Sequence, residues 1–294
     1  MDLFNRPRRS ALFVPGSKPR AAEKARGLPA DVVMLDLEDA VAPAEKASAR
    51  AFVAGFIKQR PFGRRELVVR VNEPDTVLGA EDLRSVASSA PDAVLLPKVS
   101  STEIVDKAAK VLDQSGASET QIWTMIETPG GILAASKIAA HPKVTCLIAG
   151  TNDLSAELRA APGPDRAELA VSLQMIVLAA RAAGVTALDG VYNAFSDTQG
   201  LAGECRQGRA LGFDGKTLIH PSQIAVANEA FAPDPDALEL AQRQIAVYEQ
   251  AKSDGQGIAV LDGKIVENLH VAAAQRLMAQ WEAIKALSST SDSH

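Results

Sequence analysis

The chain has 294 residues, about twice the length of a typical domain, which allows two ordinary domains or one large single-core fold. Hydrophobic residues make up 47% and charged residues 23%, as in a folded globular protein, which excludes disordered, collagen-like and disulfide-scaffold classes. The 31 Lys and Arg residues against 36 Asp and Glu give a net charge of −5, so neither nucleic acid nor a membrane is an expected partner.

Eight apolar, β-branched runs bounded by turn residues predict strands, and alanine-rich segments of helical length lie between them. The order is strand then helix throughout. The predicted strands are residues 10–14, 32–37, 67–71, 93–96, 122–126, 144–149, 186–191 and 217–219. The predicted helices are residues 19–26, 43–58, 79–88, 101–115, 130–140, 165–183 and 197–211.

Near-continuous apolar strands that alternate with amphipathic helices are typical of a parallel sheet covered by helices. Eight such units match a (β/α)8 TIM barrel, which takes about 250 residues. A doubly wound open sheet is the alternative, but no G-x-G-x-x-G motif follows the first strand, and eight regular units favour closure. We therefore predict an α/β fold in which residues 1–230 form a (β/α)8 catalytic barrel.

The alternation of predicted strands and helices ends at Pro233, Asp234 and Pro235, which signal the start of a helix. Residues 237–253 and 271–287 then predict two helices, and residues 255–266 hold two short apolar runs around Asp262 and Gly263, a hairpin signal. Residues 231–294 are therefore expected to form a C-terminal helical extension.

The two cysteines, Cys146 and Cys205, lie far apart and form no C-x-x-C pair, so neither a disulfide framework nor a structural zinc site is expected. The first nine residues lack the continuous apolar stretch of a signal peptide, and no later run is long enough for a spanning helix. We expect a cytoplasmic protein.

Polar residues at the end of each predicted strand are the candidate site residues, because the active site of a parallel barrel lies at the carboxyl ends of its strands. Acidic side chains predominate among them. In chain order they are Asp36, Glu38, Asp39, Arg70, Asn72, Lys98, Glu127, Asp153, Asp189 and His220.

Glu127 and Asp153 are the predicted metal ligands. Carboxylates that converge at one rim repel each other unless a cation lies among them, and hard oxygen ligands suit Mg²⁺, which one or two carboxylates hold together with water and substrate. The alternative is that each is an ordinary helix-capping or loop acid.

Arg70 lies within a predicted strand, where an inward arginine is costly unless it meets an anion. Its partner is either a substrate oxyanion or a carboxylate, Glu38 or Asp36, and the two interpretations are compatible. Alternation along the strand puts Asp36 and Glu38 on one face, while Asp39 belongs to the turn. These acids either orient Arg70 and metal-bound water or form only a salt-bridge cluster.

Lys98 and His220 each follow a strand directly. A lysine among so many carboxylates should keep a high pKa, which makes a Schiff base unfavourable. His220 is either a packing residue or a base. The segment from Gly16 to Arg20, with Lys18, forms a charged turn into a helix, which suits a phosphate or is a plain solvated loop.

Taken together, these motifs closely resemble the citrate lyase β-subunit-like family, related to the malyl-CoA and citramalyl-CoA lyases of the HpcH/HpaI aldolase superfamily. The resemblance runs in the right order from Arg9 to about Arg276. It rests on residues 9–16, 35–41, 69–72, 96–98, 126–128, 211–216 and 219–221.

The resemblance implies a Mg²⁺-dependent enzyme, with Mn²⁺ as a substitute, whose extension covers a neighbouring subunit's barrel mouth in a homotrimer or homohexamer. Glu127 and Asp153 match the family's metal ligands, and Arg70 matches the residue that contacts the substrate oxygen. Lys18 and Arg20, with Phe13 in the first motif, match the region that receives coenzyme A.

One departure concerns the extension, where the family usually places a catalytic aspartate after a Gly-Lys-Met-Val-type segment. Here Gly263, Lys264, Ile265 and Val266 lead to Glu267. The extra methylene displaces a proton-transfer group by about 1 Å, a shift that can cost roughly a hundredfold in rate. The substrate or the reaction is therefore expected to differ from that of the best-known members.

The sequence thus predicts a carbon–carbon lyase that cleaves a malyl-CoA or citramalyl-CoA type thioester reversibly to acetyl-CoA and a 2-oxo acid. Arg70 and Glu267 are the predicted catalytic residues, and the predicted substrate contacts are Asp36, Glu38, Arg70, Lys98 and Glu127. Three alternatives stay open: a malyl-CoA thioesterase, a citrate lyase β subunit acting on a citryl carrier-protein thioester, and a non-catalytic binding subunit.

Overall fold

The computed structural model describes residues 6–161, 163 and 165–288. Internal contacts divide the described residues into two compact units, Arg8–Phe231 and a second unit that contains residues 6–7 and 232–288. Among the described residues, no helix is both long and apolar enough to cross a membrane.

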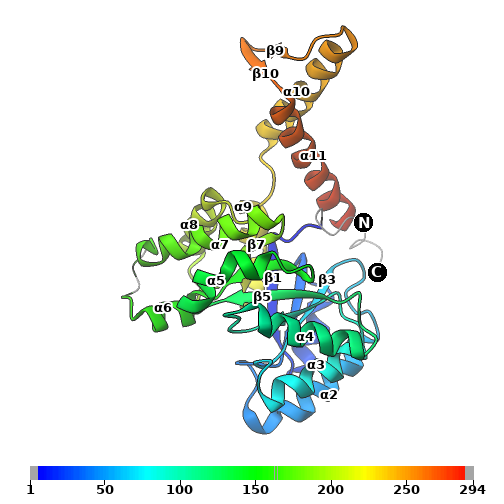
Figure 1. Cartoon of the computed structure of the whole chain (residues 1–294), viewed down its shortest axis with the longest axis vertical. Coiled ribbons are helices and arrows are strands. Elements are labelled where there is room, and N and C mark those ends of the chain that lie inside the picture. Colours follow the sequence, from blue (N-terminus) through cyan, green and yellow to red (C-terminus); the bar gives the residue numbers. More distant parts are fainter. Residues whose placement is uncertain (1–5, 162, 164, 289–294) are drawn as a thin grey trace. The chain divides into compact units, whose positions relative to one another are not determined.

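In the first unit, eight parallel strands of the described chain close into a barrel in sequence order, which confirms the predicted (β/α)8 fold (Figure 1). The strands are β1 Ser10–Pro15, β2 Val32–Asp36, β3 Glu66–Arg70, β4 Ala93–Leu96, β5 Gln121–Ile126, β6 Val144–Ala149, β7 Thr186–Asp189 and β8 Gly215–Leu218. Each apolar run of the sequence therefore became a strand, with ends within a few residues of those predicted.

Helices cover the outside of the barrel. They are α1 Pro19–Ala25, α2 Lys46–Ile57, α3 Val77–Ala87, α4 Thr102–Gln114, α5 Pro129–Ala139, α6 Thr151–Leu158, α7 Ala170–Ala183, α8 Thr198–Leu211 and α9 Ile224–Ala230. Single 3₁₀ turns precede α2, α7 and α9 at Pro43–Glu45, Ala167–Leu169 and Pro221–Gln223. The short helices α6 and α9 were not predicted, because each buries only two residues and leaves little apolar periodicity in the sequence.

Alternation along the strands sorts the side chains into two layers. Val32 and Met34 of β2 face the barrel interior, where they pack with residues such as Trp123, whereas Val33 and Leu35 pack outward against the helices. Because successive side chains point to opposite faces of a strand, the same period carries Asp36 to the interior set at the carboxyl end of β2. The fold thus aims particular strand-end residues into the mouth of the barrel.

The expectation that Asp189 belongs to the barrel mouth is wrong. Its neighbour Leu188 faces the interior, so Asp189 points outward into the layer under α8. There its carboxylate meets Lys216 Nζ at 3.0 Å and Arg166 Nη1 at 2.7 Å, and Lys216 also contacts Glu204 at 2.6 Å. Asp189 and Lys216 are fully buried. The two cations hold the pKa of Asp189 below its usual value, although burial alone would raise it.

The second unit contains α10 Pro235–Ser253, the antiparallel strands β9 Ala259–Leu261 and β10 Lys264–Val266, and α11 Asn268–Ser288. The hairpin turn falls at Asp262 and Gly263, both of which have positive φ, as a tight two-residue hairpin requires. The hairpin packs on α10 through a small apolar cluster that includes Ala251, Ala259 and Val266.

Candidate active site

A cavity of about 320 Å³ opens at the carboxyl ends of the strands. Its lining includes Asp36, Arg70, Glu127 and Asp153, so the structure brings together four residues predicted from separate strand ends. The register explains part of this convergence: Asp36 and Arg70 are direct partners across β2 and β3, and both follow interior-facing residues at the strand period.

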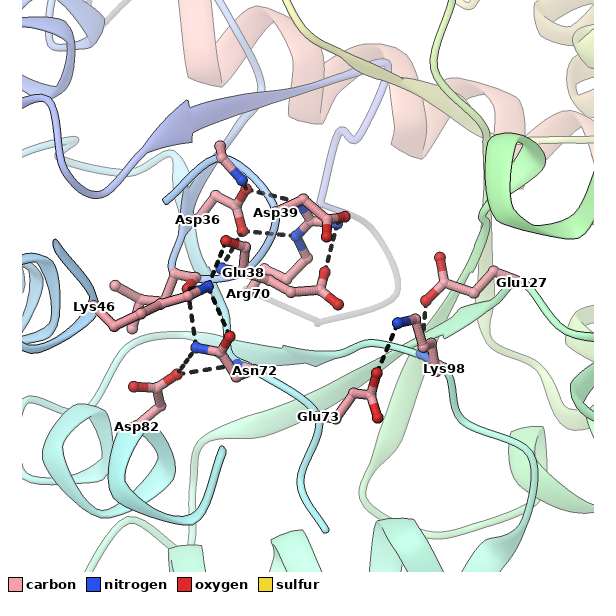
Figure 2. A network of polar contacts seen from close by, with 12 residues as sticks. Asp36, Glu38, Asp39, Lys46, Arg70, Asn72, Glu73, Asp82, Lys98 and Glu127 are labelled. Atoms are coloured by element: carbon pink, nitrogen blue, oxygen red, sulfur yellow. Dashed lines mark hydrogen bonds and ion pairs between the residues drawn. The ribbon is translucent and has the colours of Figure 1, made fainter. Parts of the chain in front are cut away.

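Arg70 is held by a fork of carboxylates, as Figure 2 shows. Its Nε and Nη2 donate to the two oxygens of Asp36, each at 2.7 Å, and Nη1 lies 2.8 Å from Glu38 and 3.4 Å from Asp39. The guanidinium also lies over the ring of Phe13, 4.8 Å from its centroid. Both ion pairs anticipated for Arg70 are therefore present, and its guanidinium plane is fixed before any substrate arrives.

The pKa values of the groups in this fork are strongly shifted, and the causes differ from group to group. Burial would lower the pKa of Arg70, but the hydrogen bond and charge of Asp36, with Glu38 and Asp39, raise it well above the ordinary value. Burial raises the pKa of Glu38 to about 8, against the opposing effect of Arg70. Asp36 additionally accepts the backbone N–H groups of Glu38 and Ala40, at 2.9 and 3.2 Å, which fixes the turn after β2.

Glu127 follows β5 and is only 3% exposed. Its Oε1 accepts the backbone N–H of Lys98 at 2.7 Å. Burial raises the pKa of Glu127 to about 7, the Lys98 hydrogen bond lowers it, and the neighbouring charge of Asp153 raises it again. Asp153 itself is exposed and lies in the first turn of α6. Because Glu127 and Asp153 line the same cavity and both carry carboxylates, they repel each other.

The donor set fits a divalent cation of the Mg²⁺ class. Mg²⁺ is held by one or two carboxylates together with water and substrate oxygens, which matches Glu127 and Asp153. A cation would also relieve the repulsion between these two carboxylates, which adds to the effect of burial on the pKa of Glu127. Within the described ranges, no cluster of three or more His, Cys, Asp or Glu side chains is arranged to hold a metal, so a closed all-protein site is absent there.

Lys46 and Asp82 belong to a supporting network that the sequence did not reveal. Lys46 Nζ donates to the carbonyls of Leu37 and Glu38 at 2.8 and 2.7 Å, and to Asn72 Oδ1 at 2.8 Å. Asn72 in turn donates to Asp82 at 2.6 Å (Figure 2). This network ties the turns after β2 and β3 together. Both missed residues lie on helices, so a search at strand ends passes over them.

The remaining predicted residues lie in different surroundings. Lys98 Nζ pairs with Glu73 at 2.7 Å, and this hydrogen bond raises the pKa of the lysine, as expected from the surrounding carboxylates. Lys18 and Arg20 are exposed at the start of α1, after β1. Glu267 is exposed just before α11, in the second unit, where its N–H donates to His270.

His220 is exposed and caps the 3₁₀ turn after β8. Its ring stacks on Phe195 with centroids 4.8 Å apart, and its Nδ1 contacts Ser222 Oγ at 2.8 Å. These contacts favour the packing and hydrogen-bonding interpretation of His220 over the base.

A family model, HpcH/HpaI aldolase/citrate lyase, matches residues 9–221. The chain belongs to this family. Membership confirms the resemblance stated from the motifs, and the matched range covers the barrel strands and every site residue of the first unit.

Within the HpcH/HpaI family, the chain is 50% identical over 280 residues to (3S)-malyl-CoA thioesterase of Cereibacter sphaeroides (strain ATCC 17029 / ATH 2.4.9), covering 95% of this chain and 96% of that protein. It is 34% identical over 284 residues to citrate lyase subunit beta of Escherichia coli (strain K12), covering 94% of each. A solved structure of CitE from Mycobacterium tuberculosis, in complex with magnesium, acetoacetate and coenzyme A, superposes with a TM-score of 0.75 at 32% identity, covering 93% of this chain and 97% of that one.

Proposed function

We propose that this chain is a Mg²⁺-dependent enzyme that hydrolyses the thioester of (3S)-malyl-CoA to malate and coenzyme A. The observation that carries the proposal is the 50% identity, over nearly the whole of both chains, to proteins named for that activity. Citrate lyase β subunits match at 34–37%. This order favours the thioesterase, which the sequence left as an alternative, over the lyase that it put first.

Glu127 and Asp153 would hold the cation, as the CitE structure with magnesium supports for a relative. When bound, the cation supplies a Lewis acid that neutralises the substrate's 2-hydroxy acid oxygens. In hydrolysis, a water oxygen bonds to the thioester carbonyl carbon, the C–S bond breaks, and the departing thiolate takes a proton.

Arg70 stabilises the negative charge that develops on the thioester oxygen. Its guanidinium carries five N–H donors: Asp36 takes two of them, and Nη1 faces Glu38 and Asp39, which leaves the second N–H of Nη2 for a substrate oxygen. The carboxylate fork and the Phe13 ring hold this donor in a fixed direction, so no reorganisation is needed when the charge appears. Glu38, whose pKa burial raises to about 8, is suited to exchange a proton beside this group.

The second candidate reaction is retro-Claisen cleavage to acetyl-CoA and glyoxylate. It is favoured by family membership and by the same arginine, because an acetyl-CoA enolate carries its charge on the same thioester oxygen. In that reaction Glu267 is the proposed proton donor to the enolate carbon.

The proposed coenzyme A contacts are Lys18, Arg20 and Phe13. The two cationic side chains follow β1 at the start of α1, where exposed positive charge can meet phosphate, and Phe13 lines the cavity. Neutralising Lys18 and Arg20 together should raise KM for the acyl-CoA without changing kcat.

The proposed role of the extension is to complete the site of a neighbouring copy in a homotrimer or homohexamer. Its hairpin exposes the cross-strand pair Val260 and Ile265, which are 65% and 57% exposed, an apolar surface that suits a subunit contact. Mixing Glu127→Gln and Glu267→Gln chains, each inactive in cleavage to acetyl-CoA, should restore part of that activity if each site draws on two subunits.

One experiment separates the reactions. Purified protein is incubated with (3S)-malyl-CoA and Mg²⁺ in water labelled with the heavy oxygen isotope, and the products are read by mass spectrometry. Malate carrying one heavy oxygen, with free coenzyme A and no acetyl-CoA, supports the thioesterase. Acetyl-CoA and glyoxylate as the first products would replace it with the lyase. Turnover that persists in EDTA would overturn the metal assignment for either reaction.

A further inference from the structure

Lys98 adopts a backbone conformation that side-chain-bearing residues seldom take. It follows β4 and Pro97, and its φ is +51°. The left-handed region costs a residue with a Cβ atom conformational energy, and such residues persist where the surrounding structure requires them. The sequence offers no glycine at this position, although glycine would adopt the conformation without strain.

This conformation turns the amide of Lys98 onto a carboxylate. Beyond β4 the pairing with β5 continues through Val99, whose N–H donates to the carbonyl of Met125 at 3.3 Å. The N–H of Lys98 instead leaves the strand ladder and donates to Oε1 of Glu127 at 2.7 Å (Figure 2). A hydrogen bond to an ionised acceptor in a buried setting is among the stronger ones in proteins.

The ammonium group of Lys98 contributes much less to this arrangement. It lies 2.7 Å from Glu73, but the two side chains are 40% and 44% exposed, and ion pairs so open to solvent contribute little. The main chain of Lys98 is therefore the part that acts directly on Glu127.

Glu127 is confined on its other side as well. A Cβ atom at Gly150 would lie 2.5 Å from Oε2 of Glu127, so this oxygen packs closely against a residue that must have no side chain. With Oε1 fixed by Lys98 and Oε2 set beside Gly150, two backbone features define one position for the carboxylate.

We propose that Lys98 is a positioning residue that acts through its main chain: its left-handed conformation holds an N–H on Oε1 of Glu127 and so presents the carboxylate to the divalent cation. The inference rests on the proposed function, which makes Glu127 a metal ligand. It replaces the substrate contact predicted for the Lys98 side chain with a role in metal affinity.

The test measures Mn²⁺ binding to EDTA-treated protein in the absence of substrate. Electron paramagnetic resonance monitors the free and bound Mn²⁺ and gives the Kd. Lys98→Gly keeps the conformation and the N–H, so its Kd should stay within about twofold of the unaltered chain. Lys98→Met, which removes only the charge, should do the same. Lys98→Val adds a β-branched side chain that resists positive φ and should weaken Mn²⁺ binding by about tenfold or more.

Ala90 provides a matched control, since its φ is +46° in an exposed turn after α3. Ala90→Val should lower the thermal midpoint while leaving Mn²⁺ binding unchanged. If Lys98→Val does not fold, Lys98→Thr is the second variant: it is also β-branched and should bind Mn²⁺ more weakly than Lys98→Ala, whose single Cβ carries the same strain as the lysine and which should bind like the unaltered chain.

Equal loss of Mn²⁺ binding in the glycine and valine variants would overturn the inference, because the side chain would then be the working part. Unchanged binding in the valine variant would overturn it too. Failure of the underlying function looks different: Glu127→Gln would bind Mn²⁺ as well as the unaltered chain, whatever Lys98 does.

Discussion

Gly150 closes against the side chain of Glu127, and adding one methyl group there should disable the site. A Cβ atom at Gly150 would stand 2.3 Å from Cβ and 2.5 Å from Oε2 of Glu127, where ordinary contacts begin at 3.4 Å. Glu127 must therefore move by about 1 Å, and a displacement of that size in a reacting group can cost about a hundredfold in rate.

The rest of the protein should tolerate Gly150→Ala. Overpacking one methyl group costs about 1–3 kcal/mol, which a folded barrel survives. The assay compares kcat, Mn²⁺ affinity and the thermal midpoint with those of Gly130→Ala. A Cβ at Gly130, in the first turn of α5, would meet only Ser100 at 3.7 Å, so this control should keep its activity.

A Gly150→Ala enzyme with a kcat within a few-fold of the unaltered chain would refute the reasoning, because Glu127 would then have no fixed position to lose. Equal losses in both alanine variants would point instead to a general effect on the barrel mouth.

The further predictions concern three carboxylates. Asp153→Asn should abolish Mg²⁺-dependent turnover while leaving the thermal midpoint of the metal-free protein nearly unchanged, since Asp153 is exposed; retained activity would remove it from the metal site. Burial raises the pKa of Glu127 from 4.5 to about 7, so in that window the folded metal-free chain binds more protons there than the unfolded chain does. Its unfolding free energy should therefore fall as the pH rises from 4.5 to about 7, and urea titrations should show Glu127→Gln lacking that component. Mn²⁺ affinity should rise over the same range, because the ligand must lose its proton. For cleavage to acetyl-CoA and glyoxylate, Glu267→Gln should lower kcat far more than it changes KM, and an unchanged kcat would place the proton source elsewhere.

The barrel and the site residues at its strand ends could be predicted from the sequence, because both follow from the alternation of side chains along each strand. Apolar runs located the strands, and the residue after each run located Asp36, Arg70 and Glu127, which the parallel register then brought together. Assigning strand-end residues to the barrel mouth failed for Asp189. In β7 it is Leu188 that faces the interior, so the next residue, Asp189, points outward and its carboxylate contacts Lys216.

Other features depend on geometry that residue types do not encode. Lys46 lies at the start of α2, and only the folded turn after β2 brings its ammonium to two carbonyls and Asn72. The left-handed turn at Lys98 has no signal in the sequence, because lysine is not a residue that predicts positive φ. Asp153 was correctly placed near Glu127, but the helix that carries it, α6, was missed.

The charge balance of the cavity sets an order of events for any ligand that enters it. Among the described residues that line it, four carboxylates, Asp36, Asp39, Glu127 and Asp153, face a single guanidinium, Arg70, which is already engaged by its neighbours. The proposed substrate, malyl-CoA, is itself an anion, and an anion approaching this mouth meets repulsion until positive charge has been added. The enzyme should therefore follow compulsory-order kinetics, with the cation before the thioester, so that each turnover begins from a cavity whose negative charge the cation has already reduced.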